Sequence, residues 1–449
     1  MPFRVDVIDN IPSRAGGPHA QERQADLQIA WAGPEANASR ALRAVYDLAT
    51  TPLPDEALDL LEIATAVYVA DIACRRGERE AWPRSISLSV PVRDPAAWAP
   101  VLPDLHRLLF ELNRDSFQIG LRQANFAASG AEAMGGSHLP DADCVSMLSG
   151  GLDSLAGAAM LQQTGRRPIY SLHQSGNPSV RSAQAGVLEA IERHWPGRSA
   201  SCACSVEPSP GGAEALPYPP PEQREPSRRC RSFLFMALAL ATAEAIGVED
   251  VFMCENGVMT AGLPLSASRA GSMSTHSTHP MALALMNRIA GELGLRGRLI
   301  NPFVYQTKAE LLRDVLAPVL SVGEIQSTVS CWAAGRAPRP CGGCVPCLLR
   351  QIGMAWAELP EEAHMLQVLE RPEDYGGTDA YGNLVDLLRH ARQTVDASDA
   401  QLLGLQPGLL SLQAAGLEFA EVIAMLRRHA QQTLAVVAER YPAAARLTG

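Results

Sequence analysis

The sequence predicts an α/β protein built around a parallel sheet with helices on both faces. Three observations indicate this class. From about residue 144, short apolar strands alternate with helix-length segments, which is the order of βαβ units. A Gly-Gly turn joins the first of these strands to its helix, and a cluster of four cysteines follows near residue 340. We expect three parts, at residues 1–138, 139–358 and 359–449.

Residues 1–138 are expected to form an N-terminal α+β domain. Its predicted strands have alternating polarity and its predicted helices have helical apolar spacing. The strands fall at 3–8, 26–31, 86–92 and 117–121, and the helices at 58–74 and 98–112. A small, glycine-rich linker follows at 127–137. We find no catalytic constellation in this part, so its role stays unassigned.

Residues 139–358 carry the predicted parallel sheet. Strands are expected at 144–148, 168–173 and 251–254, and helices at 154–163, 180–194 and 232–246. A proline-rich loop at 208–226 interrupts the alternation. The third part, 359–449, is expected to be a helical extension, because 384–392 and 419–440 have amphipathic spacing. Such an extension suits a cap, a dimer surface or a docking surface.

Composition excludes several classes of protein. The chain has 449 residues, of which 47% are hydrophobic and 19% charged, so it is globular. Its net charge of −10 argues against bulk binding of nucleic acid. The longest apolar run, 233–246, is too short to cross a bilayer, and the N-terminus has no apolar signal-peptide core. We therefore expect a cytoplasmic protein without membrane partners.

The turn after strand 144–148 reads Ser149-Gly150-Gly151-Leu152-Asp153-Ser154. A turn from a parallel strand into a helix points backbone N–H groups and the positive helix end at a ligand beyond the sheet. Glycines allow phosphate oxygens to approach the backbone, and the two serines can donate hydrogen bonds. Asp153 suits a magnesium ion or a helix cap. The alternative is an ordinary Gly-Gly turn. The predicted ATP-binding residues here are Leu148, Ser149, Gly150, Gly151, Leu152, Asp153 and Ser154.

The four clustered cysteines have the spacing C-x9-C-x2-C-x2-C. Glycines between them let the backbone fold until the thiolates converge on one ion. This pattern suits a tetrahedral structural zinc, with an iron–sulfur cluster as the rival interpretation. The predicted ligands are Cys331, Cys341, Cys344 and Cys347.

Other polar residues fall at helix starts and strand ends. Arg229 and Arg231 open the helix 232–246 and suit phosphate or carboxylate binding. Lys308 could meet the same phosphates. Asn256-Gly257 and His173 lie at or just beyond strand ends, where open α/β sheets gather ligands.

The motif at 149–154 resembles the signature of the N-type ATP pyrophosphatases, or PP-loop enzymes, and lacks the lysine of a Walker A loop. Together with the cysteine segment 344–353, it resembles the QueC family, the 7-cyano-7-deazaguanine synthases of queuosine biosynthesis. The resemblance covers about 143–358. It also rests on Arg229-Cys230-Arg231-Ser232, on Thr307-Lys308 and on Ser330-Cys331-Trp332.

This resemblance implies a ligase that uses ATP and Mg²⁺ and carries a structural Zn²⁺. A 7-deazaguanine carboxylate would be adenylated and passed to an amine, with release of pyrophosphate and AMP. It implies catalytic roles for Asp153, Arg229, Arg231 and Lys308. It implies nucleotide binding by residues 148–154, His173, Asn256 and Gly257.

The chain departs from the family's usual pattern. The family's substrate stretch after its third strand is replaced by the segment 255–266 and by 274–280, which are small and rich in hydroxyl groups and include His276 and His279. With the added N- and C-terminal parts, this resembles the QueC-like proteins of anti-phage systems of the Qat and type IV CBASS kinds. That branch implies a protein amine as acceptor and partner proteins from a defence operon, and it leaves a homodimer open.

Three alternatives remain from the sequence. The first is a 7-cyano-7-deazaguanine synthase that uses ammonia. The second is another PP-loop enzyme, such as a tRNA thiolase, which the net charge disfavours. The third is a non-catalytic nucleotide-binding scaffold in a defence complex, which the intact loop disfavours.

Overall fold

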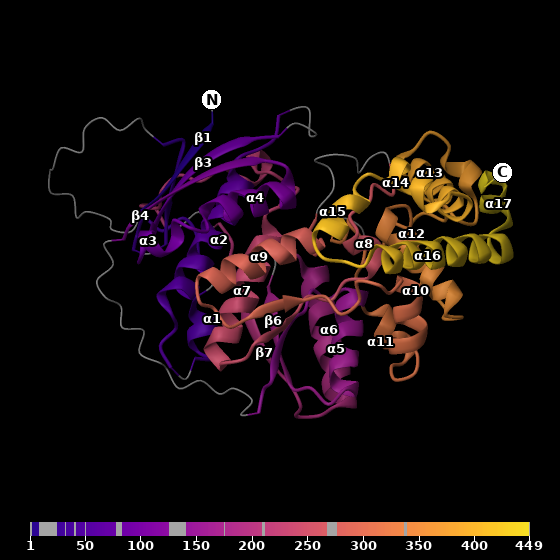
Figure 1. The fold of residues 1–449 in the computed structure, drawn as a ribbon, viewed down its shortest axis with the longest axis horizontal. Coiled ribbons are helices and arrows are strands. Elements are labelled where there is room, and N and C mark those ends of the chain that lie inside the picture. Colours follow the sequence, from indigo (N-terminus) through magenta and orange to yellow (C-terminus); the bar gives the residue numbers. More distant parts are fainter. Residues whose placement is uncertain are drawn as a thin grey trace.

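The computed structural model describes most of the chain, and the statements below concern those residues. They are 2–8, 25–31, 33–39, 42–49, 51–77, 83–124, 141–174, 176–208, 212–266, 276–335 and 339–448. The linker expected at 127–137 lies outside them. Figure 1 shows two sheets flanked by helices, with the C-terminal helices gathered at one end.

The first sheet has four strands in the order β2-β1-β3-β4, and every pair is parallel. Its elements are β1 (Phe3–Ile8), β2 (Leu27–Ala30), α1 (Leu42–Tyr46), α2 (Asp55–Ala73), β3 (Ser85–Val92), α3 (Pro95–Trp98), α4 (Leu102–Asn113) and β4 (Ser116–Gln123). The sequence predicted an α+β unit here. The observed unit is α/β, because α2 and α4 each return the chain to the same end of the sheet before the next strand begins.

The second sheet has five parallel strands in the order β7-β6-β5-β8-β9. Its strands are β5 (Cys144–Met147), β6 (Pro168–His173), β7 (Ala200–Cys204), β8 (Asp250–Phe252) and β9 (Arg298–Ile300). The sequence predicted β5, β6 and β8. It missed β7, which is built of Ala, Ser and Cys, and β9, which has only three residues, because neither has a strong apolar alternation.

Helices cover both faces of this second sheet, as the sequence predicted. They and the short elements that follow are α5 (Leu152–Gln163), α6 (Pro178–His194), η1 (Pro221–Gln223), α7 (Arg231–Ile246), α8 (Gly257–Thr260), α9 (Pro280–Glu292), α10 (Lys308–Glu310), η4 (Leu311–Leu316, a π-helical turn), α11 (Val322–Gln326) and α12 (Val345–Trp356). Helix α7 packs against four strands, and α5 packs on η4 and α6. The α/β class with a parallel sheet is therefore confirmed.

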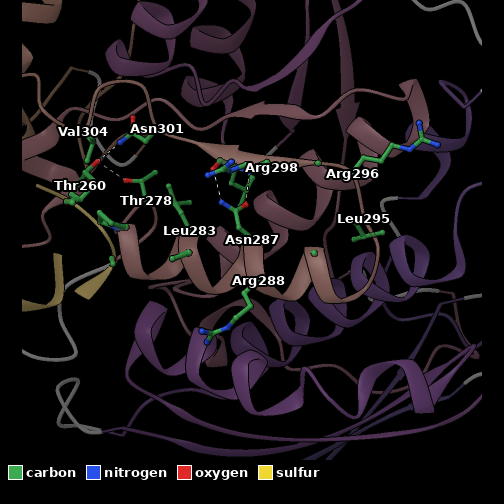
Figure 2. Close-up of a pocket in the computed structure, with 17 residues that line it drawn as sticks. Thr260, Thr278, Leu283, Asn287, Arg288, Leu295, Arg296, Arg298, Asn301 and Val304 are labelled. Carbon is green, nitrogen blue, oxygen red and sulfur yellow. Dashed lines mark hydrogen bonds between the residues drawn. The ribbon is translucent and has the colours of Figure 1, made fainter. Parts of the chain in front are cut away.

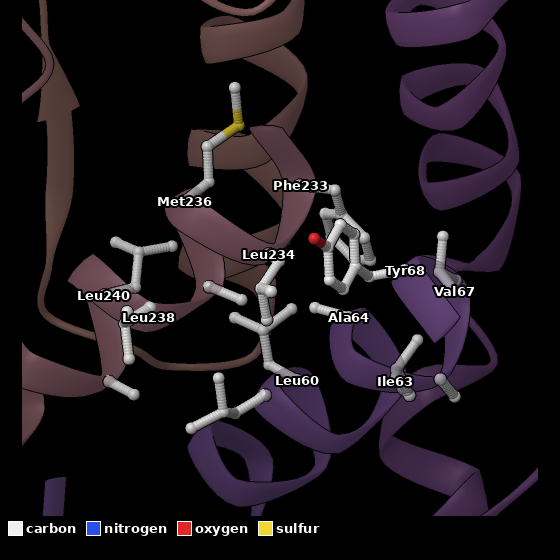
Figure 3. Packing of buried hydrophobic residues seen from close by; sticks show 14 of the residues in the cluster. Leu60, Ile63, Ala64, Val67, Tyr68, Phe233, Leu234, Met236, Leu238 and Leu240 are labelled. Carbon is white, nitrogen blue, oxygen red and sulfur yellow. The ribbon is translucent and has the colours of Figure 1, made fainter. Parts of the chain in front are cut away.

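One apolar core joins the two sheets through α2 and α7. Seventeen of the nineteen residues of α2 are buried, and α7 is buried on nearly every side. In Figure 3, Tyr68 and Leu60 of α2 interleave with Phe233 and Leu234 of α7. A helix that is apolar all round needs partners on every face, and here α2 covers the side of α7 that the second sheet does not.

A buried ion network reinforces the same interface. Arg76 and Arg84 both donate to the carboxylate of Asp115, and Arg84 also pairs with Asp71. The second oxygen of Asp71 accepts the backbone N–H of Cys230 at 3.0 Å, immediately before α7. Removing one member of such a buried network typically costs about 3–5 kcal/mol. The network therefore fixes the start of α7 relative to the first sheet.

The C-terminal part is helical, as predicted. It comprises η5 (Pro372–Tyr375), α13 (Asp379–Asp396), α14 (Asp399–Leu405), α15 (Leu409–Ala414), α16 (Phe419–Arg440), α17 (Pro442–Ala445) and η6 (Arg446–Thr448). Its apolar cluster includes residues of α8 and α12, so these helices pack on the second sheet's loops. Within the described ranges, no helix is both long and apolar enough to span a bilayer.

Two buried histidines make the stability of this helical part depend on pH. His390 of α13 and His429 of α16 each have a buried Nε2 without a hydrogen-bond partner. Burial lowers the pKa of His390 to about 4 and that of His429 to about 3, from 6.5. Both are neutral when folded but take up protons when unfolded below pH 6.5, so stability is present above that pH and falls below it.

We therefore expect the free energy of unfolding to drop between pH 7.5 and pH 5, by on the order of 2 kcal/mol for each histidine. Urea unfolding of the wild type and of a His390→Leu/His429→Leu variant at both pH values measures this. The double variant should show a smaller drop. An unchanged drop in the variant would contradict the assignment.

Candidate functional site

Residues 149–154 connect β5 to α5 in a tight turn, and we call them the pyrophosphate loop after the role that the sequence predicts for them. Gly150 has a φ of +80°, and a Cβ there would lie 2.8 Å from the backbone nitrogen of Gln184, so only glycine fits. The Oγ of Ser149 accepts the N–H of Gly151 at 3.2 Å, and the Oγ of Ser154 donates to the carbonyl of Gly151 at 2.8 Å. The turn is thus held in a compact shape at the N-terminus of α5, where anions bind.

Asp153 is buried in the first turn of α5 and is 7% exposed. Its Oδ2 accepts the ammonium of Lys308 at 2.7 Å and the amide of Asn256 at 3.1 Å. Its Oδ1 is buried without a hydrogen-bond donor. The carboxyl group of Glu255 lies beside it and accepts from the same Asn256 amide at 3.1 Å. We call Asp153 and Glu255 the carboxylate pair.

The pKa values of the two acids of this pair shift in opposite directions from their ordinary values. Burial alone would raise the pKa of Asp153, but the Lys308 ammonium and the surrounding hydrogen bonds lower it. Burial and the Asp153 charge raise the pKa of Glu255 well above its ordinary value. The site therefore holds two carboxyl groups but only one ammonium, that of Lys308. The second carboxyl group is stabilised either by a proton or by an added cation.

The sequence did not predict a role for Glu255. Its position, three residues past the end of β8 and at the same sheet edge as the pyrophosphate loop, was the signal that could have found it. Asn256, which was predicted, is fully buried and caps α8 by accepting the N–H of Met259. The Val304 carbonyl oxygen lies so close to Gly257 that a Cβ at this position would clash with it.

The C-terminal extension supports the segment that carries Lys308. Thr307 caps α10, and its hydroxyl donates to Oε1 of Gln432, in α16, at 2.8 Å. Arg428, also in α16, pairs with Glu310 at 2.7 Å and donates to the Tyr305 carbonyl at 2.7 Å. Helix α16 thus holds the residues before and after Lys308 in the chain. The sequence analysis did not predict this role of Gln432 and Arg428.

The structure separates the two predicted arginines. Arg229 is 5% exposed, and burial, followed by the charge of nearby Arg76, lowers its pKa. It lies among the charged groups that join the first sheet to α7, including Asp115 and Glu225. Arg231, at the start of α7, is exposed, with its guanidinium 5.7 Å from the ring of Phe235.

His173 lies at the end of β6, beside Tyr68 and Phe235. Its ring is 5.8 Å from that of Tyr68 and 5.4 Å from that of Phe235. Burial lowers its pKa to about 4, so the ring is neutral at pH 7. The side-chain amide of Gln184 donates to both the His173 and the Leu148 carbonyl groups, which links this wall to the loop. Helix α2 contributes Tyr68 to this wall.

The four predicted cysteine ligands converge. Their sulfur atoms all lie within 4.8 Å of one another, and all four are free thiols. Backbone N–H groups of Ala333 and Cys341 donate to the sulfur of Cys331, each at 3.3 Å, which supports thiolate charge. Four sulfurs at this separation fit a tetrahedral structural zinc, with Cys331, Cys341, Cys344 and Cys347 as ligands.

This cysteine knuckle, residues 331–347, is tied to the pyrophosphate loop. The N–H of Val329 donates to the Gly150 carbonyl at 3.0 Å, two residues before Cys331. The side chain of Asn177 donates to the Ala334 carbonyl at 2.8 Å. Metal binding at the knuckle would therefore order the segment around Val329, which contacts the pyrophosphate loop.

The altered segment after β8 is only partly described, because 267–275 lie outside the described residues. His279 accepts the N–H of Met281 and so caps α9, and its Nε2 lies 3.3 Å from the Ser411 hydroxyl. Burial lowers the pKa of His279 to about 3 and that of His276 to about 4. These contacts give His279 a structural task at the start of α9.

We expect metal removal to weaken ATP binding, because the Val329–Gly150 contact depends on the knuckle. Cys344→Ser should lose the bound zinc, measured by elemental analysis, and should bind ATP several-fold less tightly in calorimetry. Cys74→Ala removes a thiol outside the knuckle and should retain both. Stoichiometric iron in the wild type, or unchanged ATP affinity in a zinc-free variant, would contradict this prediction.

Gln432→Leu should weaken ATP binding by roughly tenfold, since it leaves the Thr307 hydroxyl without its acceptor beside Lys308. Gln431→Leu is the matched control, because the same change falls on the exposed neighbouring position of α16. Gln432→Glu keeps an acceptor and should recover most of the affinity. Equal affinity for both leucine variants would show that α16 does not support the site.

Comparison with known proteins agrees with the resemblance seen in the sequence. Residues 226–358 match the family model described as "Queuosine biosynthesis protein QueC". This segment carries Lys308, Glu255 and the cysteine knuckle, and it begins after the pyrophosphate loop.

Relatives called 7-cyano-7-deazaguanine synthase are also similar. The one from Ralstonia pickettii is 34% identical over 119 residues, which is 26% of this chain and 49% of the relative. The one from Xanthomonas axonopodis pv. citri is 30% identical over 125 residues, which is 27% of this chain and 50% of the relative. The one from Kineococcus radiotolerans is 31% identical over 118 residues, which is 26% of this chain and 46% of the relative. The chain spans about half the length of the curated relatives it matches. Over residues 226–358, this chain is QueC-like.

Proposed function

We propose that this protein activates a 7-deazaguanine carboxylate with ATP and transfers the acyl group to an amine. The observation that carries the proposal is the cluster of Asp153, Lys308 and Glu255 beside the pyrophosphate loop. A glycine turn at a helix start offers N–H donors to the β- and γ-phosphates, and Lys308 adds a positive charge beside them. The QueC-like segment supports the deazaguanine part of the proposal.

The residues of the carboxylate pair fit a magnesium ion. Asp153 has one buried oxygen without a donor, and the Glu255 carboxyl lies next to it. These two side chains would hold Mg²⁺, which when bound neutralises charge on the departing pyrophosphate. Lys308 keeps Asp153 ionised and oriented, and Asn256 holds both acids in place.

The chemistry has two steps. A carboxylate oxygen of the substrate attacks the α-phosphorus, the bond to the bridging oxygen breaks, and pyrophosphate leaves with the electron pair. The amine nitrogen then attacks the acyl carbon, AMP leaves, and the amine gives up a proton, so that an amide forms. Loop N–H groups and Lys308 stabilise the charge that develops on pyrophosphate in the first step.

We further propose that the acceptor is an amine on a protein and that the reaction serves anti-phage defence. Parts outside the QueC-like segment pack next to the site: Tyr68 of α2 contacts His173, and Gln432 and Arg428 of α16 bond to residues that flank Lys308. The segment after β8 differs from the substrate stretch usual in the synthases that it resembles. Ammonia as the acceptor, with a nitrile as the product, is the second candidate, because the matched relatives are called 7-cyano-7-deazaguanine synthase.

Purified protein with ATP, Mg²⁺ and 7-carboxy-7-deazaguanine should form AMP and pyrophosphate. Asp153→Asn keeps the shape of the side chain but removes its charge, so it should lower the rate by about 100-fold or more. Asp314→Asn, an exposed acid in η4, is the matched control and should keep the rate. Chromatography of the nucleotides measures both.

Mass spectrometry of the products identifies the acceptor. A mass increase on a co-expressed partner protein supports a protein amine, whereas efficient release of the free nitrile with ammonia supports the second candidate. ATP turnover to ADP, or no turnover that depends on Asp153, would overturn the adenylation proposal.

A further inference from the structure

A groove runs along α9 and the edge strand β9, beside the site. Its volume is about 640 Å³, which lies within the range of ligand pockets. Figure 2 shows its lining, with Thr260, Thr278, Asn301 and Val304 at one end and Leu295 with Arg296 at the other. Figure 1 places α9 between the first sheet and the C-terminal helices.

The inner end of the groove adjoins the carboxylate pair. The side chain of Asn301 donates to the Glu255 carbonyl at 2.9 Å and to the Thr260 hydroxyl at 2.9 Å. The Thr260 hydroxyl lies 3.3 Å from the same carbonyl and 3.3 Å from the Thr278 hydroxyl. Asn301 and Thr260, which form the groove wall at this end, are therefore hydrogen-bonded to the main chain of Glu255.

The lining is positive in a chain that is negative overall. Three of its 17 residues are arginines, none is an acid, and the net charge of the chain is −10. Arg288 is held by both carboxylate oxygens of Asp104, outside the lining. The side chain of Arg296 is more than half exposed and lies 3.9 Å from Glu244, so this pair contributes little and an incoming carboxylate can compete for Arg296.

The rest of the lining suits an extended chain. Apolar side chains of Leu283 and Leu295 line the groove, and the small residues Ala284 and Gly291 leave its wall low. The Asn287 side chain bonds to both the N–H and the carbonyl of Leu299, at 2.8 and 3.0 Å. That amide caps the exposed edge of β9, so an occupant is recognised through its side chains and not by adding a strand.

We propose that this groove holds an extended, acidic polypeptide segment of the acceptor protein and directs its amine toward the carboxylate pair. The inference rests on the proposed function, because it names the partner of the same site. Acidic side chains meet Arg296 and Arg298, and apolar side chains between them meet Leu283 and Leu295. The amine end enters past Thr278 and Thr260.

Fluorescence anisotropy with synthetic peptides tests the groove without any need for turnover. The probe is a labelled peptide of alternating Glu and Leu with a free N-terminal Gly, and the matched probe has Lys in place of Glu. The acidic peptide should bind, more weakly as salt rises, and the basic peptide should not. Arg296→Glu/Arg298→Glu should weaken binding by about tenfold or more. Ala284→Trp, which fills the groove, should do the same.

Arg43→Glu is the control, because it reverses an exposed charge on α1, away from the groove. Pyrophosphate exchange by the groove variants should stay at the wild-type level, which separates this inference from adenylation. Equal binding of both peptides, or acidic binding unaffected by the groove variants, would overturn the groove as the docking site. Loss of exchange in the wild type, with peptide binding intact, would overturn the proposed function alone.

Discussion

The buried ion pair between Asp153 and Lys308 is the interaction on which the candidate site depends. A carboxylate at the start of α5 and an ammonium 155 residues later meet at 2.7 Å, with both side chains at most 10% exposed. Charges buried this deeply need partners, because desolvation of an unpaired ion costs several kcal/mol. The pair therefore fixes the distance between the pyrophosphate loop and α10. Glu255 and Asn256 from the end of β8 complete the cluster.

The parts outside the QueC-like segment are built into this arrangement. Helix α16 holds the Lys308 segment through Gln432 and Arg428, and α2 packs along α7 in the shared core. The ion network of Asp71 and Asp115 sets where α7 begins, and with it the place of Arg229 and Arg231. The N-terminal part thus holds the start of α7, and the C-terminal part holds the segment that carries Lys308. Whether 1–138 and 359–449 are separate folding units stays a prediction.

The electrostatic pattern is consistent with a two-step ligase. The pyrophosphate loop, Lys308 and Glu255 lie together at the carboxyl ends of β5 and β8, where open α/β sheets bind ligands. Burial and the Asp153 charge raise the pKa of Glu255 there. The groove beside β9 is lined by arginines and by small and apolar residues. In the proposed reaction, ATP and the acceptor use distinct surfaces of one chain.

The sequence by itself determined what depends on neighbours in the chain. The loop 149–154 and the four cysteines have fixed short spacings, and β5, β6 and α16 have strong apolar patterns, so each could be predicted. Tertiary structure alone decided which distant residues meet. Glu255 joins Asp153, Gln432 supports Thr307, and Arg229 lies in the interface network, because sheet order and helix packing bring them together. The parallel pairing of the first sheet and the existence of β7 and β9 were also decided there, since short strands gain their stability from pairing and burial and carry little local signal.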